Sequence, residues 1–207
     1  MMHDSDQPRL PRVVLFDMDG TLTRPLLDFP KIKAEMGIGN RPILETLAKM
    51  PDIDRRRAEA VLHRHEDHAA EHSTLNPGCR ELLEWLESVG TRVALVTRNS
   101  RRSTDTVMRK HALPFDVMVT RDDCVFKPDP APLRLACERL RVATDQAWMV
   151  GDGSHDVQAG LAAGIRTVWI SHGRERDFDE TPWRVARDLI EFHAMLRACE
   201  RSRRPSV

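Results

Sequence analysis

The chain has 207 residues, of which 32 are basic and 32 acidic, so its formal net charge at pH 7 is zero. A neutral chain of this length favours one well-buried domain with a modest insertion, and it disfavours nucleic acid or an anionic membrane surface as a partner. The four cysteines are dispersed and form no CxxC pair, which disfavours a metal knuckle, a redox dithiol or a disulfide framework.

The first predicted element is a strand over residues 13–16, an unbroken apolar run that suits a sheet covered on both faces. It leads directly into Asp17-Met18-Asp19-Gly20-Thr21. Successive strand side chains point to opposite faces, so Asp17 and Asp19 share a face and can address one ligand. Gly20 allows the chain to turn sharply there.

The next stretch, residues 22–76, holds helical segments and no convincing strand. We predict a small helical cap inserted after the first strand, between core segments 1–21 and 77–207, where it could cover the ligand site. The helix expected at residues 54–72 contains an H-x-x-E-H string in a His-rich, strongly charged stretch. Because no third zinc ligand is in an obvious place, a solvated helix face is favoured over a zinc site.

From residue 77 onward, helical and strand patterns alternate. Helices are predicted at residues 80–89, 101–111, 131–140 and 155–163, and strands at residues 93–96, 117–119, 147–150 and 167–170. This alternation predicts an α/β fold with a Rossmann-like, doubly wound parallel sheet, whose ligand site lies beyond the carboxyl ends of the strands.

Polar residues follow the other predicted strands at those ends. The second strand leads into Thr97-Arg98-Asn99-Ser100, which offers a hydroxyl and backbone N–H groups just before a helix. The third is followed by Lys127 between stiffening prolines, and Lys127 is one of only five lysines in the chain. The fourth leads into Asp152 and, four residues later, Asp156.

The order and identity of these four motifs closely resemble the haloacid dehalogenase superfamily of aspartate-nucleophile hydrolases, over about residues 13–170, with a cap in the position of that family's class I cap. The resemblance implies that Asp17 is the nucleophile, Asp19 the general acid and base, Thr97 a phosphate binder and Lys127 its charge partner. It also implies Mg²⁺ as cofactor, held by Asp17, the Asp19 carbonyl and Asp152.

Independent chemistry agrees with these implied roles. A phosphomonoester dianion repels a carboxylate, so Asp17 can attack phosphorus only if Lys127 and a cation neutralise the site. Mg²⁺ suits a sparse set of carboxylate and carbonyl oxygens. Asp19 can donate a proton to the leaving alcohol and later take one from water. The dehalogenase members lack this second aspartate, which favours a phosphatase.

Three further residues are candidates for the site, and two of them, Asp156 and Arg98, have two interpretations each. Asp156 either complements the dipole of the helix it begins or orients the metal site from behind the ligands. Arg98 and Asn99 are candidates for contacts with the substrate's phosphate, as are Thr97 and Lys127, although Arg98 could instead face solvent.

The predicted function is therefore a Mg²⁺-dependent phosphatase that hydrolyses a small phosphomonoester, phosphoglycolate-like or sugar-phosphate-like, through an aspartyl-phosphate. The alternatives are a phosphomutase using the same nucleophile and a non-catalytic protein that binds a phosphorylated ligand. A small phosphorylated metabolite is the expected partner of a monomer or weak homodimer. No leader or long apolar run is present, which predicts a cytoplasmic protein. The basic tail, residues 197–207, is expected to be disordered or to form a solvated helix end.

Overall fold

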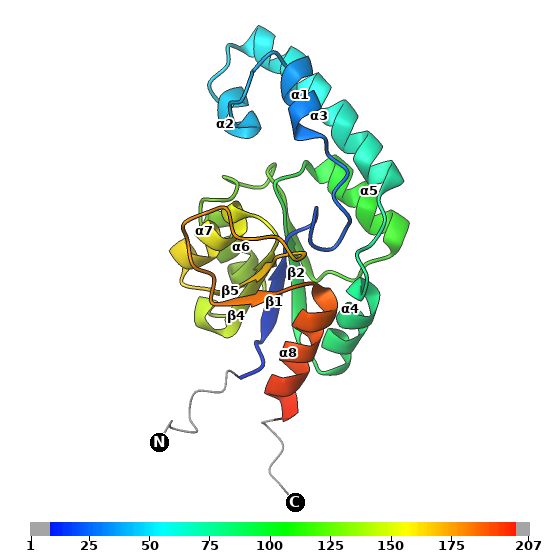
Figure 1. The fold of residues 1–207 in the computed structure, drawn as a ribbon, viewed down its shortest axis with the longest axis vertical. Coiled ribbons are helices and arrows are strands. Elements are labelled where there is room, and N and C mark those ends of the chain that lie inside the picture. Colours follow the sequence, from blue (N-terminus) through cyan, green and yellow to red (C-terminus); the bar gives the residue numbers. More distant parts are fainter. Residues whose placement is uncertain (1–8, 202–207) are drawn as a thin grey trace, which may run out of the picture.

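A six-stranded parallel sheet forms the centre of the molecule in the computed structural model, which describes residues 9–201 (Figure 1). The strand order is β3-β2-β1-β4-β5-β6, and every neighbouring pair is parallel. The strands are β1 (Val13–Phe16), β2 (Arg92–Val96), β3 (Val117–Val119), β4 (Ala147–Gly151), β5 (Arg166–Ile170) and β6 (Arg184–Ala186). The predicted α/β fold with a doubly wound sheet is confirmed.

Helices cover both faces of the sheet, and β1 shows why. Its alternate side chains enter two different apolar clusters, Val14 and Phe16 on one face and Val13 and Leu15 on the other. The first face packs against α4 (Cys79–Ser88), α5 (Arg101–His111) and α8 (Leu189–Arg201). The second packs against α6 (Ala131–Arg139) and α7 (Ser154–Ala163), and a short 3₁₀ turn, η1 (Thr144–Gln146), precedes β4. Burial on both faces explains the unbroken apolar run of β1.

Three helices lie beyond one end of the sheet: α1 (Phe29–Glu35), α2 (Ile43–Leu47) and α3 (Asp52–His72), of which α3 also packs against α5 of the core (Figure 1). They have an apolar cluster of their own, which includes Ile32 of α1, Leu44 of α2 and Leu62 of α3. We call residues 22–76 the cap segment. The domain boundaries drawn from the sequence remain a prediction.

The two ends of the cap segment are tied together by Asn76. Its side-chain amide donates to the carbonyl oxygens of Gly20 at 3.2 Å, Thr21 at 2.8 Å and Thr23 at 3.1 Å. The backbone N–H of Asn76 also donates to the carbonyl oxygen of Leu22 at 2.8 Å. The chain therefore leaves the sheet layer and returns to it at one point.

Two elements were not predicted, β6 and α8. β6 is a three-residue edge strand whose first two residues, Arg184 and Val185, are exposed, so it has no apolar run to reveal it. α8 takes up the first part of the predicted basic tail, residues 197–201, and residues 202–207 lie outside the described part of the chain. Among the described residues, no helix has the length and apolar character needed to cross a membrane.

Candidate active site

The carboxyl ends of the strands and the cap segment enclose a cavity of about 880 Å³. All eight residues singled out from the sequence line it: Asp17, Asp19, Thr97, Arg98, Asn99, Lys127, Asp152 and Asp156. They come from four separate stretches of the chain, which the parallel sheet brings to one edge. Their proximity is a structural fact, whereas their individual roles remain predictions.

Asp17 and Asp19 sit side by side at the end of β1. The backbone N–H of Asp17 donates to the carbonyl oxygen of Val150 at 2.9 Å, so sheet pairing fixes the backbone at the first acid. The carboxylate of Asp19 accepts two hydrogen bonds, from Thr23 Oγ1 at 3.2 Å and from Asn99 Nδ2 at 2.5 Å. Burial raises the pKa of Asp19, against the opposing effect of these two bonds. Asp19 is therefore both oriented and inclined to hold a proton.

Gly20 is required by the close approach of β1 and β4. Its φ of +81° lies in the left-handed region, and a Cβ atom at this position would overlap the carboxylate of Asp152. Only glycine lets the turn after Asp19 come this near to Asp152.

Lys127 is the central cation of the cavity, with only 1% of its side chain exposed. Its Nζ donates to Asp17 Oδ1, Asp156 Oδ1 and the carbonyl oxygen of Val96, each at 2.6 Å. Burial opposes the charged form, but the carboxylates of Asp156 and Asp17 outweigh it and raise the pKa of Lys127. The lysine therefore remains an ammonium group.

Three carboxylates share this lysine's neighbourhood. Asp17, Asp152 and Asp156 each offer an oxygen, and these oxygens lie within 4.8 Å of one another. Burial, together with repulsion from the neighbouring acids, raises the pKa of Asp17 to about 8 and raises that of Asp152. Three oxygen donors with an excess of negative charge fit a divalent cation of the hard, oxygen-preferring kind. The acids at the strand ends thus make a candidate metal site.

Thr97 and Arg98 lie on the loop after β2, but their side chains are engaged differently. The hydroxyl of Thr97 is buried at the cavity wall and accepts from the backbone N–H of Asn99 at 3.2 Å. The guanidinium of Arg98 donates to the carbonyl oxygen of Lys127, pairs with Glu45 of α2 at 2.9 Å and stacks on Phe126. In this structure Arg98 links the core to the cap, and its predicted contact with phosphate remains a prediction.

The loop after β5 also reaches the site, which the sequence analysis missed. His172 shares a 2.6 Å hydrogen bond between its Nε2 and the carbonyl oxygen of Gly20, and Arg174 pairs with Asp152 at 3.0 Å. Both residues line the cavity. In the sequence, only the position of His172 and Arg174 could have indicated their place in the site. They follow a predicted strand that ends at residue 170, and the loop after that strand should lie at the same edge of the sheet.

A sequence profile of the haloacid dehalogenase-like hydrolase family matches residues 27–170 of this chain. The chain belongs to the haloacid dehalogenase-like hydrolase family. The resemblance drawn from the four motifs is thereby confirmed, and with it the prediction that the chain is an enzyme of the hydrolase class.

Individual relatives of this hydrolase span most of its length. A phosphoglycolate phosphatase of Nitrosococcus oceani is 29% identical, with 90% of this chain and 96% of the relative covered. A phosphoglycolate phosphatase of Pseudomonas savastanoi pv. phaseolicola is 32% identical, with 87% and 78% covered. The crystal structure of a hydrolase from Pseudomonas syringae superposes with a TM-score of 0.75 at 21% identity, over 90% of this chain and 98% of the other.

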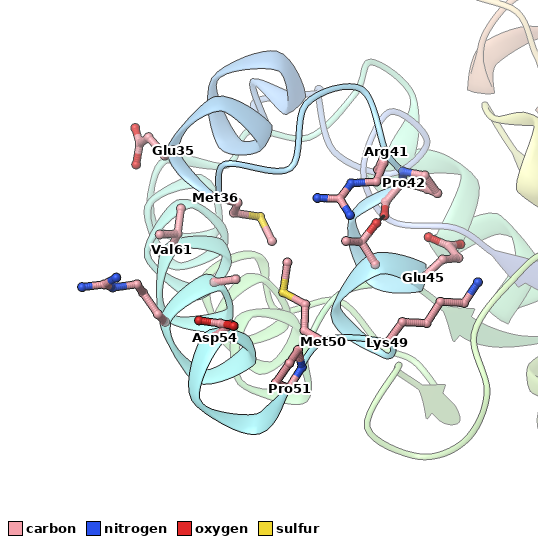
Figure 2. A pocket seen from close by; sticks show the side chains of 13 residues that line it. Glu35, Met36, Arg41, Pro42, Glu45, Lys49, Met50, Pro51, Asp54 and Val61 are labelled. Carbon is pink, nitrogen blue, oxygen red and sulfur yellow. Dashed lines mark hydrogen bonds between the residues drawn. The ribbon is translucent and has the colours of Figure 1, made fainter.

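The hydrolase has a second cavity, of about 610 Å³, inside the cap segment (Figure 2). Charged side chains of both signs border it, among them Glu35, Arg41, Lys49 and Asp54. None of the eight residues singled out from the sequence lines it. In the part of the chain that the structure describes, the close group of three candidate metal ligands is that of the three aspartates above, so the preference for a solvated face over a zinc site at the cap's histidines remains a prediction.

Proposed function

We propose that this haloacid dehalogenase-like phosphatase hydrolyses a small phosphomonoester of the phosphoglycolate kind, through an aspartyl-phosphate on Asp17 and with Mg²⁺ as cofactor. One observation carries the proposal: Asp17, held by Lys127 at 2.6 Å, and the hydrogen-bonded Asp19 face the same cavity. The relatives that are named phosphoglycolate phosphatases support the substrate class.

Asp17 is suited to attack phosphorus. A carboxylate oxygen of Asp17 forms a bond to phosphorus while the bond from phosphorus to the substrate's alcohol oxygen breaks. The ammonium of Lys127 offsets the negative charge that gathers as carboxylate and phosphate meet. Because Lys127 is also bonded to Asp156 and to Val96, its position is set before the substrate arrives.

Asp19 is suited to move the proton in both halves of the reaction. Its protonated carboxyl gives a proton to the departing alcohol oxygen, which leaves Asp19 ionised. It then takes a proton from the water whose oxygen attacks the phosphorus of the aspartyl-phosphate, and the Asp17 carboxylate is released. Asn99 and Thr23 hold the two oxygens of Asp19, so the carboxyl points at a fixed place during both transfers.

Mg²⁺ would be held by the group formed by Asp17, Asp152 and Asp156. The family resemblance implies the Asp19 carbonyl as a further oxygen ligand. When bound, Mg²⁺ would neutralise phosphate charge and favour the ionised form of Asp17. Arg174 holds Asp152, and Lys127 holds Asp17 and Asp156, so the chain itself orients the carboxylates of this group.

Lys33 of α1 supports a substrate with a second anionic group. Three other cations that line the cavity have acidic partners: Lys127 has Asp17 and Asp156, Arg98 has Glu45, and Arg174 has Asp152. The half-buried Lys33 makes only a 3.4 Å contact with the carbonyl oxygen of Asn40 within the described chain. It can therefore pair with the carboxylate of a compound such as 2-phosphoglycolate.

The test is phosphate release from a panel of phosphomonoesters, including 2-phosphoglycolate, ribose 5-phosphate and glucose 1-phosphate, with Mg²⁺ or with a chelator. We expect Mg²⁺-dependent release that is abolished in Asp17→Asn and unchanged in Glu84→Gln, which alters an exposed acid of α4. No metal-dependent release from any ester, or full activity in Asp17→Asn, would overturn the proposal. Isomerisation of glucose 1-phosphate without phosphate release would identify a phosphomutase instead.

A further inference from the structure

A buried ion pair joins the cap segment to the core beside the active site. Glu66 lies in the charged helix α3, yet it is only 4% exposed. Both of its carboxylate oxygens accept from the guanidinium of Arg121, which lies in the loop after β3. Glu66 also lines the active-site cavity, so the pair is not an ordinary surface contact.

The pair is bonded to the loop that follows β2. Arg121 donates to the carbonyl oxygen of Arg98 through its guanidinium at 3.1 Å, and to that of Asn99 through its backbone N–H at 3.2 Å. Glu66 accepts a hydrogen bond from Ser100 Oγ at 3.1 Å. Three consecutive residues of the loop are thus held by the two members of one ion pair.

The middle residue of this loop, Asn99, is the one that holds Asp19. Its side-chain amide donates to Asp19 Oδ2 at 2.5 Å. A chain of direct contacts therefore runs from Glu66 through Arg121 and the loop to the proposed general acid.

Fold stability alone is a weak reason to bury such a pair. Removing two charges from water is costly, and well-packed apolar residues of similar volume often give equal or greater stability. A second ion pair also joins α3 to the core, between Asp67 of α3 and Arg102 of α5, at 2.7 Å, near the surface. The surface pair needs no fully buried charge, because the side chains of Arg102 and Asp67 are 75% and 26% exposed.

We propose that Glu66 is a positioning residue that acts through Arg121 and Asn99: the ion pair fixes the loop so that Asn99 holds Asp19 in line with the substrate's leaving oxygen. The assignment rests on the proposed phosphatase function. If Glu66 has this role, Asp19 transfers its proton efficiently only when cap helix α3 is packed against the core, because only then does Glu66 contact the loop of residues 98–100.

The test compares Glu66→Met/Arg121→Met with Asp67→Asn. The double variant replaces both charges with apolar side chains of similar length, which leaves no unpaired buried charge. It is assayed for kcat and KM on 2-phosphoglycolate, whose alkoxide needs a proton to leave, and on p-nitrophenyl phosphate, whose leaving group does not. Thermal unfolding shows that each variant is folded.

The expected result is a loss of about tenfold or more in kcat/KM on 2-phosphoglycolate, as for a displaced general acid, with less than about threefold on p-nitrophenyl phosphate. Asp67→Asn should change neither value. In an Asn99→Ala background the double variant should add no further loss, because both changes interrupt the same chain of contacts. Equal losses on the two substrates, or losses that multiply with Asn99→Ala, would overturn the proposal.

Amide hydrogen exchange gives a readout that does not depend on activity. The pair should protect the amides of residues 98–100, so exchange there should be faster in the double variant and unchanged in Asp67→Asn. Unchanged exchange in the double variant contradicts the positioning role even if the protein hydrolyses none of the esters. Wild-type inactivity with faster exchange would instead count against the proposed function alone.

Discussion

Lys127 and Asp156 form an ion pair at 2.6 Å in which both side chains are buried, and both residues line the same cavity as Asp17. The same ammonium reaches Asp17 Oδ1 at an equal distance. One lysine therefore balances two carboxylates at once, and the third, Asp152, depends on Arg174. Because each charged residue of the site has different partners, substitution of each one should change activity or stability in a different way.

Lys127→Met should lower kcat by at least about 100-fold, because it removes a positive group aimed at the reacting phosphate. Lys127→Arg should not restore activity. The ammonium makes three hydrogen bonds and the side chain is only 1% exposed, so a larger, planar guanidinium cannot take its place. Phosphate release measures both variants. Lys31→Met, which alters an exposed lysine of α1, is the control and should keep wild-type kcat; a similar loss there would contradict the assignment.

Asp19→Asn should affect esters according to their leaving group. For 2-phosphoglycolate, kcat/KM should fall by about 100- to 10,000-fold, the usual range for a lost general acid. For p-nitrophenyl phosphate, kcat/KM should fall much less, because its phenolate leaves without a proton. Steady-state kinetics on the two substrates checks this, and an identical fall on both would show that Asp19 serves some other purpose.

Lys33→Gln should weaken binding only of substrates with a second anionic group. Loss of one charged hydrogen bond should raise KM for 2-phosphoglycolate about tenfold. KM for ethyl phosphate, which has the same carbon chain length without the carboxylate, should not change. Lys31→Gln, an exposed neighbour on α1, is the matched control. If KM rises equally for 2-phosphoglycolate and ethyl phosphate, Lys33 does not bind the carboxylate of the substrate.

Mg²⁺ should stabilise the fold, and its effect should increase with pH. Burial and neighbouring acids raise the pKa of Asp17 to about 8, so part of the population binds a proton at neutral pH in the absence of the cation. Mg²⁺ competes with that proton, and its affinity therefore rises between about pH 6 and pH 8.5. The increase in Tm on adding Mg²⁺ should therefore be larger at about pH 8.5 than at about pH 6, and it should be smaller in Asp152→Asn than in the wild type. An equal increase in Tm at these two pH values would contradict the metal assignment.

The sequence predicts the sheet and its strand ends because apolar runs and the acids that follow them are local signals. Asp17, Lys127 and Asp152 could be brought together on paper from the topology of a parallel sheet alone. Glu66 could not, because eight of the ten residues from His63 to His72 are ionisable, and nothing local separates a buried acid from solvated ones. Its burial follows from Arg121, 55 residues away in the chain.

Helix α8 was predictable in principle, in contrast to β6. Leu189, Phe192, Leu196 and Cys199 are buried at helical spacing, although the basic residues after position 196 make the end of this helix look like a solvated tail. Arg98 shows the opposite limit. Its position beside Thr97 suggests a phosphate contact, but the structure gives its guanidinium a partner in the cap, Glu45, that no local pattern reveals.

The amide of Asn76, which ties the two ends of the cap segment together, has a consequence for how this enzyme can change. A segment whose ends lie side by side can be lengthened, shortened or exchanged without altering the distance that the core must span. Substrate selectivity could thus change by replacement of the cap segment at this one connection to the core, without any change in the residues at the strand ends. The contacts between cap and core limit this freedom, since any replacement segment would have to supply new partners for Arg121 and Arg98, which now pair with Glu66 and Glu45.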